Sequence, residues 1–258
     1  MNANVSRIVL RPRGAAEVFD LTFRVVREAW APTARLTAVV TLPLWLACVV
    51  ACWLSEGHWA VALPPVVLAG ALQAPYTVLV GRIMFADDAT VGEVLAQTLR
   101  RTPTLLLGAL LATLANTLTS LTCFLALPLV QAVFLYLPET TLLEGVDLQR
   151  GLKRSQRLAG ARFGLALAGA LSWWVLTAWA AVVGEATWQG LVETVLQLGT
   201  PFGSALTGHV TPGLVGGLIL AQPLHAVYRA LLYLDARTRS EGWDLQVALR
   251  AASLVEAR

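Results

Sequence analysis

The basic residues of this chain are confined to a few of the segments that separate its apolar runs, and no other feature constrains the fold as much. All nineteen Lys and Arg residues lie within 1–35, 82–101, 150–162 or 229–258. The segments 55–58 and 185–212 contain none, nor does the short break around Ala126. Because basic loops resist translocation, this alternation predicts a polytopic membrane protein whose basic segments all face the cytoplasm.

The apolar runs between these segments predict an all-α fold with six transmembrane helices. We place the spans at 36–54, 59–80, 105–125, 127–143, 163–183 and 214–234. The apolar run over 105–143 is too long for one helix crossing a hydrocarbon core of about 30 Å, so we expect a break at Pro128. One tilted span there would move the C-terminus outside and destroy the charge alternation. Six spans instead leave both termini in the cytoplasm.

Composition agrees with a single integral membrane domain over residues 1–258. The chain is 57% hydrophobic and 14% charged, with a mean hydropathy of +0.66. Six spans of about 20 residues use nearly half of it, which leaves no room for a separate soluble catalytic domain. The net charge of +3 therefore points to anionic membrane lipids as partners, not to nucleic acid. The richness in Arg, Ala and Leu suggests a bacterial inner-membrane protein.

The segments outside the spans are predicted to include interfacial amphipathic helices. The N-terminal segment 1–33 contains one over 15–30, with Phe19, Phe23, Val26 and Trp30 on one face and charged residues on the other. The outer segment 186–198 repeats the pattern without positive charge. A cytoplasmic helix is expected over 235–258. Short matches between these segments, such as Asp-Leu-Gln at 147–149 and 244–246, suggest an internal repeat.

Two charged residues fall inside predicted spans, where each costs about 2.5–3.5 kcal/mol at the centre of a helix. These are Glu139 and Arg229, which should lie at similar depth near the cytoplasmic interface. Arg229 shares a helical face with other polar side chains, and Glu139 shares one with Gln131. We predict that the two faces meet and that Glu139 pairs with Arg229; snorkelling of Arg229 and a proton or substrate pathway are the alternatives. The polar cluster comprises Gln131, Glu139, Gln222, His225, Arg229 and Tyr233.

Two further groups of residues are candidates for a site at the cytoplasmic surface. Lys153, Arg154, Ser155 and Arg157 precede the fifth span, and they either bind a phosphate headgroup or simply stop translocation. A C-terminal motif consists of Asp235, Arg237, Arg239, Glu241, Gly242 and Asp244. We interpret it as a solvated, salt-bridged hinge in preference to a ligand site, with Gly242 ending the sixth helix.

The sequence contains no motif of a common enzyme class. It has no zinc-binding HExxH, no phosphate-binding glycine loop and no nucleophile elbow. The three cysteines lie within apolar runs, which argues against a disulfide framework or a metal site. We therefore expect no catalytic residues, no metal and no cofactor.

The C-terminal stretch Leu-Leu-Tyr-Leu-Asp-Ala-Arg-Thr-Arg-Ser-Glu-Gly-Trp-Asp-Leu over 231–245 resembles the closing motif of the bacterial glycerophosphoryl diester phosphodiesterase membrane-domain family. Glu144 and the segment 152–160 are similar to that family's central motif, although residue 151 is Gly where the family usually has Ala. The segment 17–27 looks like its N-terminal helix. The resemblance implies a six-helix membrane module without the family's soluble catalytic domain, and a molecular role that is generally unassigned.

These observations predict a non-enzymatic membrane module that organises lipid or a partner protein, either a second copy or another chain. The basic amphipathic helices, which suit anionic headgroups, are the main reason. The alternative is a transporter or channel for a small solute that uses Glu139, His225 and Arg229, with prolines interrupting the spans. An intramembrane enzyme is a third, weaker hypothesis.

Overall fold

The computed structural model describes residues 13–85, 90–199 and 201–242, and over these residues the chain is helical with no strand. The expected all-α fold is therefore confirmed for this part of the chain. The α-helices are α1 (Ala15–Glu28), α2 (Trp30–Leu36), α3 (Leu42–Leu54), α4 (Leu63–Phe85), α5 (Val91–Thr122), α6 (Leu127–Phe134), α7 (Leu137–Leu143), α8 (Leu148–Ala161), α9 (Phe163–Gln189) and α10 (Pro212–Glu241). Short π-helical segments (Thr37–Thr41, Gly190–Val195) and 3₁₀ turns join some of them.

Five helical segments among the described residues are long and apolar enough to cross a membrane. They are Trp30–Leu54, Val91–Thr122, Phe124–Leu143, Phe163–Val195 and Pro212–Glu241. The second predicted span, 59–80, coincides with the 3₁₀ turn Trp59–Ala62 and most of the 23-residue α4. These helices are compatible with a multi-pass membrane protein, and the total of six spans remains a prediction.

Several helices extend beyond the predicted spans. α5 begins at Val91, where the Thr90 side chain caps its N-terminus, so the basic segment and the third span form one helix. α9 continues through Gly190–Val195, and 186–198 is therefore not the separate helix we predicted. α10 continues to Glu241 and ends at Gly242, whose φ of 58° suits glycine. The prediction for Gly242 is confirmed, whereas a separate tail helix from 235 is wrong; 243–258 lies outside the described residues.

The long apolar run breaks where we expected and also at a second place. Cys123 is extended and Phe124–Ala126 forms a 3₁₀ turn, with Pro128 in the first turn of α6. The fourth span is then divided into α6 and α7 around residues 135–136. Pro138 has no N–H to donate to the carbonyl four residues earlier, so the helix cannot continue unbroken through this point. The single span 127–143 is thus two short helices.

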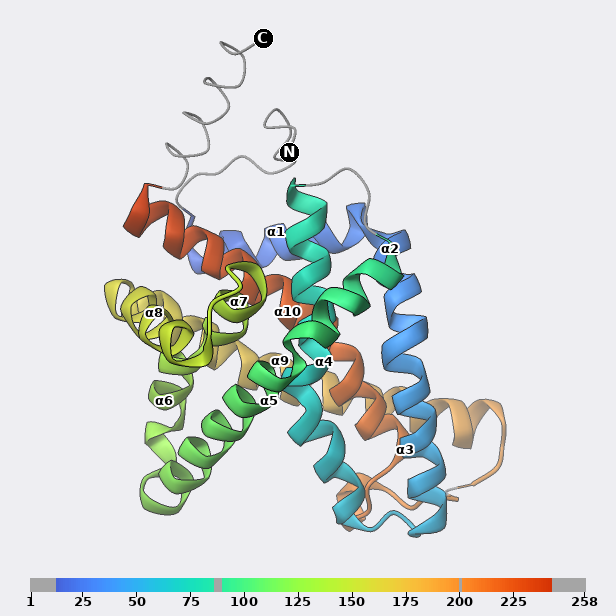
Figure 1. Cartoon of the computed structure of the whole chain (residues 1–258). Coiled ribbons are helices and arrows are strands. Elements are labelled where there is room, and N and C mark those ends of the chain that lie inside the picture. The colour runs from blue at the N-terminus through green and yellow to red at the C-terminus, as the bar shows by residue number, and fades with distance from the viewer. Residues whose placement is uncertain (1–12, 86–89, 200, 243–258) are drawn as a thin grey trace.

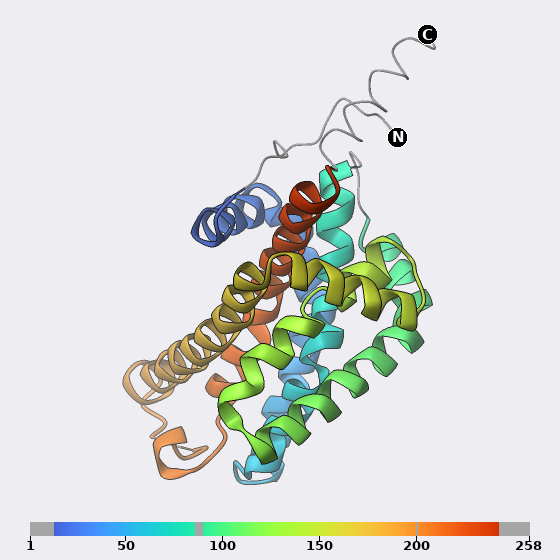
Figure 2. The ribbon, with the colours of Figure 1, turned by 90° about the vertical axis from the view of Figure 1, so that its left-hand side faces the viewer.

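Helix α10 is the central element of the fold and packs against α9, α4, α1, α3 and α8. In its most apolar window 72% of residues are buried, against 6% for α5 at the periphery. Figures 1 and 2 show the other helices arranged around it. Glycines allow the close crossing with α9, since a Cβ on Gly217 would lie 2.0 Å from the Ala180 carbonyl oxygen. Small residues commonly permit such approach between membrane helices.

Helix α1 lies across the end of the bundle where α10 ends (Figure 1). It buries Val18, Thr22 and Val25 against the core. The apolar face that we predicted, which included Phe23 and Trp30, is rotated away from this buried face. These two side chains are 49% and 66% exposed. Exposed aromatic residues at this edge are suited to the headgroup region of a membrane.

The far end of the bundle is closed by contacts between loops. Val210 donates a backbone hydrogen bond of 2.8 Å to the Gly57 carbonyl, and the Trp45 indole donates to the Pro212 carbonyl at 2.9 Å. Near the middle of α4, the Tyr76 hydroxyl is hydrogen-bonded to Thr41 in the π-helical segment. These polar contacts join α3, α4 and the start of α10.

Candidate intramembrane binding site

A buried ion pair joins α7 to α10. Arg229 Nε donates to Glu139 Oε1 at 2.6 Å, and the Glu139 side chain is fully buried. The predicted pairing of these two residues is therefore present. Pro138 lies in the first turn of the short α7, directly before Glu139. Separating a buried pair leaves an uncompensated charge, which is strongly destabilising.

A third helix enters the site through Gln73 of α4. Arg229 Nη1 donates to Gln73 Oε1, and Gln73 Nε2 donates to Gln222 Oε1 at 2.7 Å. Gln222 in turn donates to the Leu218 carbonyl at 2.7 Å. We did not predict Gln73, although an amide inside the apolar run 59–80 was the available signal. The network holds the Arg229 guanidinium in a fixed orientation.

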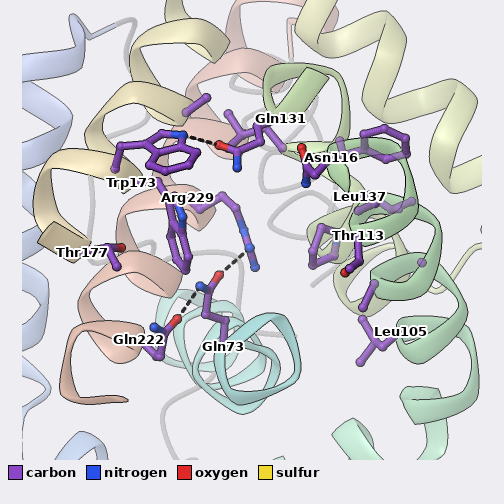
Figure 3. Close-up of a pocket in the computed structure, with 18 of the residues that line it drawn as sticks. Gln73, Leu105, Thr113, Asn116, Gln131, Leu137, Trp173, Thr177, Gln222 and Arg229 are labelled. Atoms are coloured by element: carbon purple, nitrogen blue, oxygen red, sulfur yellow. Dashed lines mark hydrogen bonds between the residues drawn. The ribbon is translucent and has the colours of Figure 1, made fainter. Parts of the chain in front are cut away.

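A cavity of about 640 Å³ lies beside this network. Residues of α4, α5, α6, α7, α9 and α10 line it. Figure 3 shows Gln73, Gln222 and Arg229 on one side and Leu105, Thr113 and other α5 side chains on the other. Most lining side chains are Ala, Leu, Thr or Trp, with a few polar groups between them.

The cavity is bordered by exposed residues of α5 and α9. Four of its lining residues, Thr113 and Thr117 of α5 and Trp174 and Ala178 of α9, are also exposed on the surface of the protein. All four lie well inside segments that are long and apolar enough to cross a membrane. A mouth at this position would face the lipid acyl chains and not the aqueous phase.

Some buried polar atoms at this site have no hydrogen-bond partner within the described part of the chain. They include Arg229 Nη2, Glu139 Oε2 and the amide oxygen of Asn116. Arg229 and Asn116 line the cavity, whereas Glu139 does not. Since buried polar groups nearly always find a partner, Arg229 and Asn116 are lining residues whose hydrogen-bonding capacity is not fully used within the described part of the chain.

The other members of the predicted polar cluster are divided between different partners. Gln131 lines the cavity but accepts a hydrogen bond from the Trp174 indole at 2.8 Å instead of contacting Arg229. His225 lies 3.3 Å from the Thr177 hydroxyl and stacks near the Trp173 ring. Both therefore connect to α9, and we expected neither contact.

Tyr233 belongs to a second site, an ionic cluster formed with Glu144, Arg154, Arg237 and Glu241. Tyr233 donates to Glu144, which also pairs with Arg154. Arg154 Nη2 donates to Glu241 at 2.9 Å and Arg237 Nε to the same carboxylate at 3.2 Å. Burial lowers the pKa of Arg154, but its two carboxylate partners outweigh this and raise it above the usual value. The cluster joins α8 to the end of α10.

The C-terminal motif is therefore mostly buried and is not the solvated hinge we predicted. Asp235 has a side chain only 3% exposed, and it accepts from Arg239 Nε at 2.9 Å. Asp235 also accepts from the Arg13 backbone N–H at 2.6 Å, while Arg239 donates to the Arg13 carbonyl. The motif thus attaches the segment before α1 to α10. Asp244 lies outside the described residues.

The predicted headgroup site on α8 is only partly accessible. Ser155 is buried and donates to the Val133 carbonyl at 2.9 Å, and Arg154 is engaged in the ionic cluster. Lys153 is exposed, as is Arg157, whose side chain is 71% exposed. Arg154 and Ser155 therefore make contacts inside the protein, whereas Lys153 and Arg157 lie on its surface.

Among the described residues, no three His, Cys, Asp or Glu side chains are grouped so as to hold a metal ion. Comparison of the chain with protein-family models, with curated proteins and with solved structures finds no match. Interpretation of the site therefore depends on its own geometry.

Proposed function

We propose that this chain is a non-enzymatic, six-span protein of the bacterial inner membrane, with both termini in the cytoplasm, that binds a lipid-like molecule in the cavity beside Arg229. The observation that carries this proposal is the cavity itself, together with the exposed residues of α5 and α9 that border it. A lipid-like molecule could enter from the bilayer without passing through water.

The size and lining of the cavity support such a ligand. Pockets of about 300–1,000 Å³ with apolar walls and a few placed polar groups are typical of small-molecule sites, and this cavity has about 640 Å³. Along α5 its lining extends from Thr104 to Thr117, which is roughly 20 Å at 1.5 Å per residue. An elongated apolar space of this kind matches an alkyl chain better than a compact polar solute.

A pair of α5 variants tests the proposal. Ala112 lines the cavity, whereas Leu114 points away from it and is 55% exposed. We expect Ala112→Phe to fill the cavity and reduce the lipid that co-purifies in a mild uncharged detergent, measured by mass spectrometry. Leu114→Phe adds an aromatic ring to the same helix and is expected to retain the wild-type amount. Equal retention by both variants would count against the proposal.

A surface role in organising anionic lipid is a second candidate, favoured by the exposed basic face of α8. The side chains of Arg150 and Arg157 are 82% and 71% exposed, and Lys153 lies on the same helix. Each such charge contributes about 1 kcal/mol near an anionic bilayer. The triple variant with glutamine at these positions is expected to lose its preference for anionic over zwitterionic lipid in the surrounding annulus. An unchanged preference would argue against this role.

We further propose that the chain is a membrane module of the glycerophosphoryl diester phosphodiesterase membrane-domain type. The support is that the C-terminal residues that carry the resemblance have structural roles in this chain. Asp235 and Arg239 attach the segment before α1 to α10. Arg237 and Glu241 are members of the ionic cluster, and Gly242 ends α10. Motif residues so engaged serve the architecture of the module and provide no esterase chemistry.

A further inference from the structure

We infer that the ligand of this cavity is an anionic amphiphile, whose acidic oxygen group (a phosphate ester or a carboxylate) accepts a hydrogen bond from the Arg229 guanidinium. The inference deepens the proposed function and depends on it. It adds the charge class of the ligand and the residue that recognises it.

Only the positive end of the ion pair lines the cavity. Arg229 is the only ionisable residue among the described residues that line the cavity. Its partner Glu139 is fully buried on α7 and does not contribute to the wall. The cavity therefore presents the positive end of a pair that is neutral as a whole. A cationic ligand would find no carboxylate here, whereas an anionic one would find a guanidinium.

Two of the three guanidinium nitrogens of Arg229 donate to side chains of the protein. Its Nε donates to Glu139 and its Nη1 to Gln73, and both contacts hold the guanidinium plane in place. Nη2 is buried and has no partner within the described part of the chain. A guanidinium is a donor at all of its nitrogens and accepts at none. Any ligand group that binds this guanidinium must therefore be an acceptor, and an anionic oxygen is the strongest acceptor available.

The remaining volume of the cavity is lined by uncharged side chains. Across the cavity from Arg229 the lining includes Leu105 and Leu137 (Figure 3), which provide no charge for the rest of a ligand. A free inorganic anion would leave this space unfilled and would have to cross apolar surroundings to reach it. An alkyl chain fills the same space favourably. One acidic oxygen group on an apolar chain therefore satisfies both parts of the cavity.

The inference is tested with probes that differ in one property at a time. Purified protein in an uncharged detergent is titrated with lysophosphatidic acid, with the fatty acid and the monoacylglycerol of the same chain length, and with inorganic phosphate. Binding is followed by native mass spectrometry and by the fluorescence of the cavity tryptophans. We expect both anionic amphiphiles to bind at least about tenfold more tightly than the monoacylglycerol, as one charge-assisted hydrogen bond predicts. Inorganic phosphate is expected to bind weakly or not at all.

The variants locate the charge preference at Arg229. Arg229→Gln is expected to remove the preference for the anionic probes. Because this change leaves Glu139 without its partner, the double variant E139Q/R229Q is measured as well; it keeps two neutral amides of similar size and is expected to bind all three amphiphiles equally. Retention of the tenfold preference in the folded double variant would overturn the assignment to Arg229.

The remaining outcomes separate the inference from the proposed function. Equal binding of the monoacylglycerol and the fatty acid by the wild type would overturn the anionic ligand and leave an amphiphile-binding cavity. Phosphate binding as tight as that of lysophosphatidic acid would overturn the amphiphile and leave a small-anion site. If no amphiphile binds to the wild type, or if Ala112→Phe does not weaken the binding, the proposed function itself fails.

Discussion

Replacement of Glu139 by glutamine would leave Arg229 as a buried cation whose hydrogen-bond partners are all neutral. The wild-type contact is short at 2.6 Å, and the Glu139 side chain is fully buried, with Arg229 only 14% exposed. Water can therefore screen the remaining charge very little. Gln73 would still accept from Arg229, but an amide oxygen does not compensate the charge.

The expected cost follows from these conditions. Removing one partner of a buried pair destabilises a protein by about 3–5 kcal/mol. For a chain of this size that corresponds to a fall in Tm of roughly 6–20 °C. The double variant E139Q/R229Q buries two amides and no charge, so we expect it to be more stable than either single variant.

Thermal unfolding in detergent, followed by tryptophan fluorescence, measures the four members of this double-mutant cycle. We expect a favourable coupling energy of about 1–3 kcal/mol between the two positions. The charge-swapped variant E139R/R229E is expected to recover part of the stability that each reversal loses. Additive effects in the cycle, combined with no recovery in the swap, would refute the reasoning and favour an Arg229 that simply reaches towards the headgroups.

Three further predictions concern other parts of the fold. Gly217→Val is expected to destabilise the protein by about 1–3 kcal/mol or more because the new side chain overlaps the α9 backbone, while Gly164→Ala, where nothing lies within 4 Å, is the matched control in the same unfolding assay. Arg154→Gln removes the shared cation of the ionic cluster, and we expect a loss of roughly 1–3 kcal/mol together with faster proteolysis near the end of α10. Tyr76→Phe is expected to cost about 1 kcal/mol through its lost hydrogen bond, measurable as a lower Tm.

The pairing of Glu139 with Arg229 was predictable because a charge inside an apolar span demands a partner, and the two residues lie at similar depth. Gln73 could not be found in this way. A neutral amide is cheaper to bury and can bond to its own backbone, so nothing in the linear sequence requires it to meet Arg229. The same holds for Gln131, whose partner Trp174 is on α9 and not on the helix that we expected.

The C-terminal motif shows a related difference. Its alternating charges correctly indicated salt bridges and its glycine a helix end. Their burial was not visible, because it depends on how α8 and the segment before α1 cover the end of α10. The rotation of α1 was missed for a similar reason. The apolar residues of α1 cover an arc of the helix surface that is wide enough to form two alternative faces. Contact with α10 selects the face that contains Val18 and Val25.

The sequence by itself determined the all-α fold class of the described residues, the presence of several helices apolar enough to cross a membrane, and the pairing of Glu139 with Arg229. Those conclusions depend on hydropathy and charge, which are local properties of the chain. The tertiary structure alone decided that Arg229 lines a cavity while Glu139 does not, and that exposed residues of α5 and α9 border this cavity. The physical reason is that a cavity forms where packed helices leave the space between them unfilled. That depends on their rotation, spacing and breaks, to which residues distant in the chain all contribute.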